Sequence, residues 1–344
     1  MPLTIERPAP AATGQTSGER RARPGGLADR SKRILEIGLV NAMPDAAVAA
    51  TQRQFAQLIE DASGAFDVRL RLFTLESMPR AAEARRAMAV DYAAVRELER
   101  AALDALVVTG AEPRASDLRD EPFWDELGFV LDWAAENTIS SLFSCLAAHA
   151  AVLRNDGIAR RPFADKCAGV FAVEVATDHE LTAGLEPRYR APHSRWNGLD
   201  EAELVDKGYR VLARAPGCGV DLFVRKARSL LVFLQGHPEY EADTLAREHR
   251  RDLTRFLRGE TTAPPRPPAH YYPPAVAAAV ADFTRRVEAG PTATAMDFPA
   301  AALALDEAPW RDAGVRLVRN WLALTARRKA ARSVATFAVA RWGG

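Results

Sequence analysis

Short apolar runs alternate with amphipathic stretches along the first half of the chain. Continuous apolar runs are typical of buried strands, and strict alternation is typical of a half-buried strand. These patterns predict strands at 34–40, 66–73, 103–108 and 138–143. Apolar residues at helical spacing between them predict helices around 55–59, 80–100 and 123–135. The alternation of strand and helix predicts an α/β fold whose mostly parallel sheet is covered by helices on both faces.

The second half of the chain has a different pattern. Closely spaced strands joined by short turns are expected at 169–176, 209–214, 222–224 and 230–234, and a helix at 242–256. A Pro-rich stretch follows, which cannot form helix or central strand. Two further helices are expected at 276–288 and 312–328. We therefore divide the chain into a flexible leader at 1–33, an α/β domain at 34–259, and a strap with C-terminal helices at 260–344 that packs on that domain.

Composition narrows the choice of partners and compartment. The 344 residues include 46 Lys and Arg against 45 Asp and Glu, a net charge of +1, so nothing favours a nucleic-acid partner. No apolar run is long enough for a transmembrane helix, and the N-terminus lacks the apolar core of a signal peptide, so we expect no membrane association. Three cysteines are too few for a disulfide framework and leave at least one free thiol, which favours a cytoplasmic location.

The candidate chemistry lies where predicted strands end. In parallel sheets, ligands bind beyond the carboxyl ends of the strands, which selects the loops at 41–46 and 109–114 and the region of Cys145. Cys145 follows the strand at 138–143 and directly precedes a predicted helix. A helix N-terminus lowers a thiol pKa and offers backbone N–H groups to an oxyanion. A buried structural cysteine is the competing interpretation.

A histidine and a carboxylate follow another strand end. His237 comes just after the strand at 230–234, and Glu239 lies two residues further on. Together with Cys145 they predict a triad of nucleophile, base and orienting carboxylate. His149, four residues after Cys145, competes for the role of base, but its apolar surroundings favour a packing role. No cysteine or histidine pair has zinc-ligand spacing, and no Gly-rich phosphate loop occurs, so neither a metal nor a permanently bound cofactor is expected.

Taken together, these motifs resemble a known family. Their order is that of homoserine O-acyltransferases of the homoserine O-succinyltransferase type, whose fold is flavodoxin-like and of the class I glutamine-amidotransferase type. The resemblance covers about 34–326. The motifs that carry it are Asn41-Ala42-Met43-Pro44, Thr109-Gly110-Ala111, Phe143-Ser144-Cys145, Ala191-Pro192-His193-Ser194-Arg195, Gly236-His237-Pro238-Glu239-Tyr240, Arg251-Asp252 and, more weakly, Trp310 and Asn320-Trp321-Leu322.

The resemblance implies acyl transfer by a ping-pong mechanism in methionine biosynthesis. Cys145 would take the acyl group from an acyl-CoA co-substrate, and His237 would activate first Cys145 and then the hydroxyl of L-homoserine. The backbone N–H groups of Ala46 and Leu146 would bind the oxyanion. The resemblance also implies a homodimer and a set of substrate-binding positions: Lys166, Ser194, Arg195 and Arg251.

Two departures from the family pattern bear on the acyl donor. The family has a pair of lysines where this chain has Asp45 and Ala46, so a cationic side chain is lost while a backbone donor remains. At the position that selects the acyl group this chain has Arg114, close to Glu112. Arg114 could pair with the free carboxylate of a succinyl group, which favours succinyl-CoA, or it could neutralise Glu112. Acetyl transfer, or serine as the acceptor, is an alternative on the same scaffold.

Two other classes of protein remain open. One is a glutamine amidotransferase that releases ammonia from glutamine, although no synthetase domain is encoded in this chain. The other is a non-catalytic relative, which the intact Cys145, His237 and Glu239 disfavour. A glutaminase assay separates the first of these from an acyltransferase.

Overall fold

A single sheet joins almost all strands of the molecule. The computed structural model describes residues 3–8, 34–289 and 294–342. In these residues the sheet has eleven strands in the order β1-β3-β2-β5-β6-β11-β10-β9-β7-β8, with β4 beside β3. The strands are β1 (Leu3–Glu6), β2 (Ile34–Val40), β3 (Asp67–Thr74), β4 (Tyr92–Ala94), β5 (Ala105–Val108), β6 (Ser140–Ser144), β7 (Arg161–Val175), β8 (Arg188–Gly198), β9 (Arg210–Ala215), β10 (Gly219–Lys226) and β11 (Leu230–Leu234).

The parallel part of the sheet has a flavodoxin-like order. From β2 the chain moves to β3 on one side and then to β5, β6 and β11 on the other, and all of these pairs are parallel. The direction of progress reverses between β2 and β5, and sheets of this order bind ligands at the carboxyl ends of the strands beside such a reversal. The strands β1 and β4 are parallel to β3, whereas β10, β9, β7 and β8 are antiparallel to their neighbours. The predicted mostly parallel α/β sheet is confirmed.

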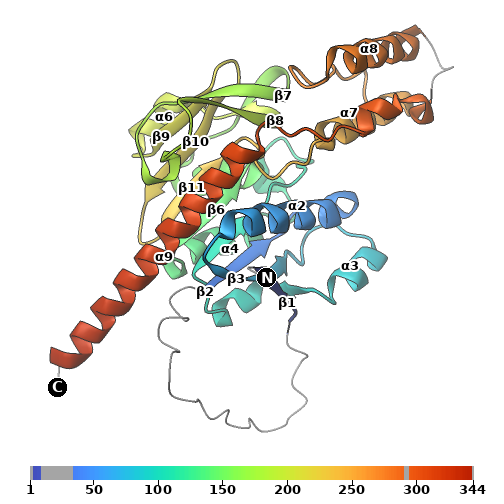
Figure 1. Cartoon of the computed structure of the whole chain (residues 1–344). Coiled ribbons are helices and arrows are strands. Elements are labelled where there is room, and N and C mark those ends of the chain that lie inside the picture. The colour runs from blue at the N-terminus through green and yellow to red at the C-terminus, as the bar shows by residue number, and fades with distance from the viewer. Residues whose placement is uncertain (1–2, 9–33, 290–293, 343–344) are drawn as a thin grey trace.

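Helices cover both faces of this sheet (Figure 1). The described helices are α2 (Asp45–Ser63), α3 (Ala82–Met88), α4 (Trp124–Asn137), α5 (Leu146–Asp156), α6 (Glu201–Asp206), α7 (Thr244–Leu257), α8 (Pro274–Ala289) and α9 (Arg311–Trp342), with short 3-10 turns at Val95–Arg100, Leu118–Asp120, Glu180–Thr182, Ala295–Asp297 and Ala300–Leu303. One apolar core lies under α2 and α9, and a second lies under α4 and α5. The long α9 is anchored by Trp321, whose buried indole donates to Ser140 Oγ at 2.9 Å.

Two predictions about local structure are wrong. The stretch 80–100 is not one helix, because α3 ends at Met88 and Tyr92–Ala94 pair with β3 as strand β4. The buried Tyr92 hydroxyl also bonds to Asn41 and Gln52, so tertiary contacts override the helix propensity of this segment. The flexible leader is wrong for Leu3–Glu6, which form β1 and pair with β3, burying Leu3. The rest of that predicted leader, at 9–33, lies outside the described residues.

The Pro-rich strap lies against β7. Ala269 pairs with Gly169, and its backbone exchanges hydrogen bonds with Ala168 and Val170 at 2.9 Å. Gly169 has a φ of 149°, and a Cβ there would lie 2.3 Å from Ala269 O, so only glycine permits this approach. The helices before and after the strap, α7 and α8, share a small separate core around Phe283. No helix in the described part of the chain is long and apolar enough to cross a membrane.

Candidate active site

Cys145 lies at a sharp turn from β6 into α5. Its φ of 49° is unusual for a residue with a side chain, and its ψ is −107°. Such a strained conformation persists only where the surroundings enforce it, and it is common at functional sites. Here the Cys145 backbone N–H donates to Leu234 O of β11 at 2.7 Å. The thiol is partly exposed and is the free cysteine of the described residues. The turn therefore presents a thiol at the start of a helix.

His237 and Glu239 form a buried pair in the loop after β11. The imidazole Nδ1 lies 2.8 Å from Glu239 Oε1, and the ring stacks on Tyr240 with 4.3 Å between ring centres. Nε2, the other ring nitrogen, has no partner at ordinary hydrogen-bond distance. Burial alone would lower the pKa of His237, but the Glu239 carboxylate and the nearby Cys145 sulfur together raise it well above its ordinary value. The Glu239 carboxylate thus orients the imidazole, and the ring lies near the Cys145 sulfur.

His149 is not suited to act as the base. Its Nε2 lies 2.6 Å from Gln235 Oε1, and the ring is buried within α5. Burial lowers its pKa to about 3, so the ring is neutral at physiological pH. The same Gln235 amide donates to Cys145 O at 3.3 Å. His149 therefore belongs to the support of the Cys145 turn, which agrees with its predicted packing role.

Two helix N-termini carry the predicted oxyanion donors. Leu146 is the first residue of α5, and Ala46 is in the first turn of α2, where N–H groups have no acceptor inside the helix. Gly110 lies against the start of α5: a Cβ built on it would be 3.6 Å from Cys145 Cβ and 3.7 Å from Leu146 N. The loop before α2 is joined to the loop after β5, because Ala42 N–H donates to Thr109 Oγ1 at 2.9 Å. The Leu146 N–H is therefore adjacent to the candidate nucleophile, and Ala46 follows a loop that contacts the neighbouring Thr109–Gly110 loop.

A buried arginine braces the loop before α2, which sequence reasoning missed. The Arg80 guanidinium, whose side chain is 3% exposed, donates to Met43 O at 2.9 Å and pairs with Asp45 at 3.0 Å. Asp45 also accepts from Ala81 N–H at 2.8 Å. Asp45 therefore serves as the partner of a neighbouring arginine, and a cation is present at this loop although the family lysines are not.

A fully buried carboxylate supports the loop that carries His237. Asp221 of β10 accepts from Gly236 N–H at 3.0 Å and from the Tyr189 hydroxyl at 3.2 Å, and its Oδ1 lies 3.3 Å from His193 Nε2. Burial raises the pKa of Asp221. A Cβ on Gly236 would lie 2.7 Å from Asp221 Oδ1, so the close approach requires glycine. Asp221 gave no sequence signal because it is one polar residue within an apolar strand.

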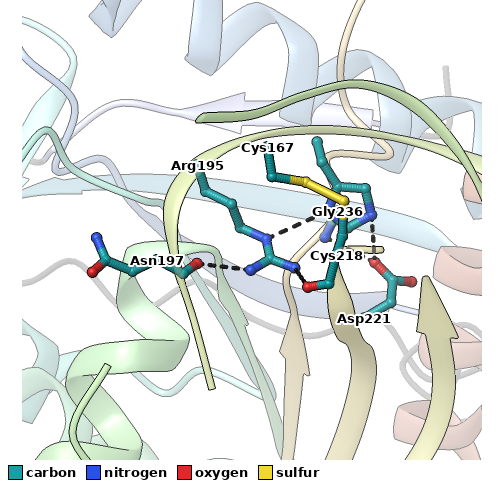
Figure 2. Close-up of a disulfide and its surroundings, with 7 residues drawn as sticks. Cys167, Arg195, Asn197, Cys218, Asp221 and Gly236 are labelled. Carbon is teal, nitrogen blue, oxygen red and sulfur yellow. Dashed lines mark hydrogen bonds and ion pairs between the residues drawn. A yellow bond between two sulfur atoms is a disulfide. The ribbon is translucent and has the colours of Figure 1, made fainter. Parts of the chain in front are cut away.

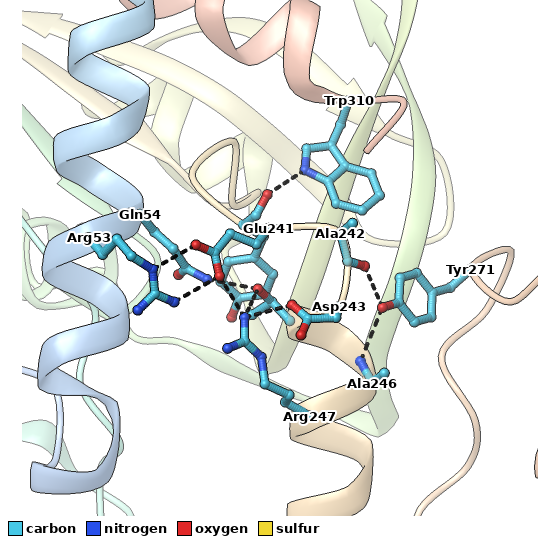
Figure 3. Close-up of polar contacts among 11 residues, drawn as sticks. Arg53, Gln54, Glu241, Ala242, Asp243, Ala246, Arg247, Tyr271 and Trp310 are labelled. Atoms are coloured by element: carbon cyan, nitrogen blue, oxygen red, sulfur yellow. Dashed lines mark hydrogen bonds and ion pairs between the residues drawn. The ribbon is translucent and has the colours of Figure 1, made fainter. Parts of the chain in front are cut away.

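The loop after His237 is held from both sides (Figure 3). Arg53 of α2 makes two hydrogen bonds of 2.9 Å to Glu241, which Arg247 of α7 also contacts at 2.7 Å. The Trp310 indole donates to Tyr240 O at 2.9 Å. These contacts join α2, α7 and the segment before α9 around the loop. They place the C-terminal part of the chain in the support of the site.

Three of the four predicted substrate-binding residues lie in one charged cluster. Lys166 of β7 pairs with Asp252 at 2.7 Å, and Arg251 of α7 contacts the same carboxylate at 2.8 Å. Ser194 of β8 donates to Glu248, which also accepts from the Tyr240 hydroxyl. Since Tyr240 stacks on His237, the cluster borders the candidate catalytic residues. Sequence reasoning did not single out Glu248.

The fourth residue, Arg195, lies elsewhere. Successive residues of a strand point to opposite faces, so Arg195 points away from the side taken by Ser194. It is 4% exposed and donates to the carbonyl oxygens of Asn197 and Cys218 at 2.7 and 2.6 Å (Figure 2). Burial lowers its pKa, and the charge on Cys145 acts in the opposite direction. Arg195 is therefore a buried residue close to the site, and its guanidinium is hydrogen-bonded to backbone carbonyl oxygens.

Glu112 and Arg114 lie on the exposed loop after β5. Glu112 pairs with Arg255 of α7 at 2.5 Å, so the alternative in which Arg114 neutralises Glu112 is wrong. Burial would raise the pKa of Glu112, but Arg255 lowers it overall. The loop is held by the buried Glu121, which accepts from the Arg114 and Ala115 N–H groups. Arg114 itself is exposed on this loop.

Comparison with known proteins gives a consistent family. The family model described as homoserine O-succinyltransferase matches residues 20–331. A homoserine O-succinyltransferase of Methylorubrum extorquens is 48% identical over 311 residues, which is 89% of this chain and 92% of that protein. One of Rhodopseudomonas palustris is 48% identical over 263 residues, covering 76% and 79%. One of Bradyrhizobium japonicum is 42% identical over 321 residues, covering 92% and 95%.

Solved structures are more distantly similar. A glutamine amidotransferase of Thermotoga maritima is 13% identical with a TM-score of 0.44, covering 85% of this chain and 98% of that chain. A glutamine amido transferase of Methylobacillus flagellatus is 14% identical with a TM-score of 0.47, covering 86% and 95%. Likeness at this level carries no argument about the activity of this chain.

Proposed function

The chain belongs to the homoserine O-succinyltransferase family, and from this premise we propose that it transfers a succinyl group from succinyl-CoA to the hydroxyl of L-homoserine through an acyl-cysteine. This is an acyltransferase step of methionine biosynthesis. The observation that carries the proposal is the free Cys145 thiol, held at positive φ at the start of α5 and faced by the His237–Glu239 pair.

The first half-reaction forms the thioester on the enzyme. The raised pKa of His237 means that the imidazole holds a proton beside Cys145, and the thiolate is the form of cysteine that attacks a thioester. The thiolate attacks the carbonyl carbon of succinyl-CoA, and the N–H groups of Leu146 and Ala46 donate hydrogen bonds to the developing oxyanion. The bond to the CoA sulfur then breaks, and CoA leaves with the proton from His237. The products are succinyl-Cys145 and a neutral imidazole.

The second half-reaction uses that neutral imidazole as the base. Acylation removes the sulfur charge that helps raise the His237 pKa, so the ring is better able to lose and regain a proton. It takes the proton of the homoserine hydroxyl, whose oxygen attacks the thioester carbon. The bond to Cys145 Sγ breaks, and the thiolate and the protonated His237 are restored. Water must stay out, or the thioester would be hydrolysed.

The charged cluster supplies the groups that an amino acid needs for binding. We propose that Arg251 binds the carboxylate of the acceptor through its guanidinium, as its family position implies, with Lys166 and Ser194 beside it. We also propose that Arg114, on the exposed loop after β5, contacts the free carboxylate of the succinyl group. Turnover of succinyl-CoA and acetyl-CoA by the purified enzyme with L-homoserine tests this choice: faster acetyl transfer would contradict it.

Two further proposals concern the state of the protein. We propose that the protein is a homodimer, which the family resemblance supports. We also propose that it is located in the cytoplasm. Its proposed small-molecule partners are acyl-CoA and L-homoserine. The proposed acyl transfer requires neither a permanently bound cofactor nor a metal. Within the described residues, no three His, Cys, Asp or Glu side chains are grouped as a metal site.

Replacing Glu239 by glutamine is expected to lower kcat by roughly 10- to 100-fold without removing activity. The amide oxygen can still accept from His237 Nδ1, but the charge that raises the His237 pKa is lost. Steady-state kinetics of the variant measure this, with the exposed Glu260→Gln as the matched control. A Glu239→Gln enzyme with the wild-type kcat would remove Glu239 from the triad while leaving Cys145 untouched.

A further inference from the structure

A disulfide joins a strand and a turn beside the site. Cys167 of β7 is bonded to Cys218, in the turn between β9 and β10, across 51 residues of sequence. The cysteine count predicted no disulfide framework, but it does not exclude a single cross-link. Cys145 is left as a free thiol, so nucleophile and disulfide have separate roles. Cys167 is partly exposed, whereas Cys218 is 2% exposed.

Both ends of the disulfide hold Arg195 (Figure 2). Cys167 is its cross-strand neighbour in the pairing of β7 with β8. The Cys218 carbonyl accepts from Arg195 Nη2 at 2.6 Å. The Cys218 end of the disulfide thus holds the Arg195 guanidinium through a backbone carbonyl. The Cys167 end lies on β7, which pairs with β8, the strand that carries Arg195. Breaking the bond removes the covalent link between β7 and the turn that carries Cys218 O.

From Arg195 a chain of contacts leads to the catalytic loop. Arg195 Nε lies 3.5 Å from His193 Nδ1, and His193 Nε2 lies 3.3 Å from Asp221. Asp221 accepts from Gly236 N–H, the residue directly before His237. A series of neighbouring side chains therefore connects the turn that carries Cys218 to the residue directly before His237.

The other side of the disulfide reaches the charged cluster. Lys166 is directly before Cys167 in β7, and its ammonium pairs with Asp252 at 2.7 Å. A change in the path of β7 at Cys167 displaces this ammonium from the cluster. The one cross-link thus borders both the catalytic loop and the proposed binding site for the acceptor.

We propose that the Cys167–Cys218 disulfide is a redox modification site whose reduction by a dithiol lowers the activity of the enzyme, an inference that rests on the proposed function. A dithiol attacks the sulfur of Cys167, the less buried of the two residues, as a thiolate; the S–S bond breaks, and Cys218 leaves as a thiolate that takes a proton. The second thiol of the reductant then releases Cys167 as a thiol. Two electrons and two protons pass to the enzyme, and the dithiol becomes a disulfide.

The oxidation state is tested by counting thiols. Protein purified without reductant is denatured and alkylated, and mass spectrometry locates the labels. The expected result is one label, on Cys145, and labels on all three cysteines after treatment with a phosphine, which cannot accept an acyl group. Labels on all three before reduction would contradict the disulfide, whatever the enzyme does to homoserine.

The effect on the site is tested with two readouts. Reduction is expected to raise the KM for L-homoserine by roughly fivefold or more, and to slow the alkylation of Cys145 in the native protein by a similar factor, because the His237 loop loses its support. The alkylation rate needs no acyl transfer. A protein without transferase activity whose Cys145 alkylation still slows on reduction would therefore overturn the proposed function and leave standing the coupling between the disulfide and the Cys145 site.

Variants separate redox control from simple stabilisation. The double variant Cys167→Ser/Cys218→Ser is expected to show the kinetics of the reduced enzyme and not to respond to the phosphine. Pro216→Ala, in the same turn with both cysteines retained, is the matched control and should respond like the wild type. If the double variant melted at a lower temperature but kept the wild-type KM, kcat and Cys145 alkylation rate, the disulfide would be structural only and the proposal wrong.

Discussion

Replacing Cys145 by alanine is expected to lower acyl transfer by at least about 10⁴-fold while leaving the chain folded. The thiolate makes the covalent bond to the acyl group, so no other described group can take its place without a new geometry. Alanine keeps the Cβ, and the strain of the positive φ at this turn is therefore unchanged. Turnover of succinyl-CoA with L-homoserine measures the loss.

The control for this variant is its thermal unfolding. Cys145 is partly exposed and its Sγ is not part of the packed core, so the melting temperature should stay close to that of the wild type. Cys145→Ser provides a second comparison, because a hydroxyl fits the same space but is a poorer nucleophile at neutral pH. Activity of the alanine variant within tenfold of the wild type would remove Cys145 as the nucleophile.

Replacing His237 by asparagine is expected to lower kcat by about 10³-fold or more. Both half-reactions lose their proton carrier, since His237 protonates the CoA sulfur and then takes the proton of the acceptor hydroxyl. Separate measurement of CoA release and of product formation should show that both steps are slow.

The matched control for this change is His179→Asn. The His179 side chain accepts from Leu181 N–H at the start of a 3-10 turn, and asparagine can make the same type of contact. It should keep the wild-type rate and pH profile. A His237→Asn enzyme with the wild-type rate of product formation would show that another group acts as the base.

The parts of the fold that sequence predicts well are those with a strong local pattern. The run at 34–40 coincides with β2, and Cys145 and His237 follow β6 and β11, both of which the pattern predicts as strands. The candidate catalytic residues lie in the segments that follow these strands. Local pattern and the rule for ligand sites in parallel sheets together select the right edge of the sheet.

The parts that sequence reasoning missed depend on distant partners. β1 has four residues, and its pairing with β3 joins positions that are more than 60 residues apart. Arg80 and Asp221 each have a role only because the fold buries them beside backbone groups of another segment. The contacts of Cys167 with Cys218 across 51 residues are equally invisible to a local pattern. Such features follow from topology, which the periodicity of a sequence does not contain.

The central claim is that Cys145 becomes acylated, and mass spectrometry of the protein after incubation with succinyl-CoA tests it most directly. The expected result is one succinyl group on the peptide that contains Cys145, which disappears when L-homoserine is added and O-succinylhomoserine forms. An unmodified Cys145 peptide under conditions that give product, or an acyl group on another residue, would contradict the account.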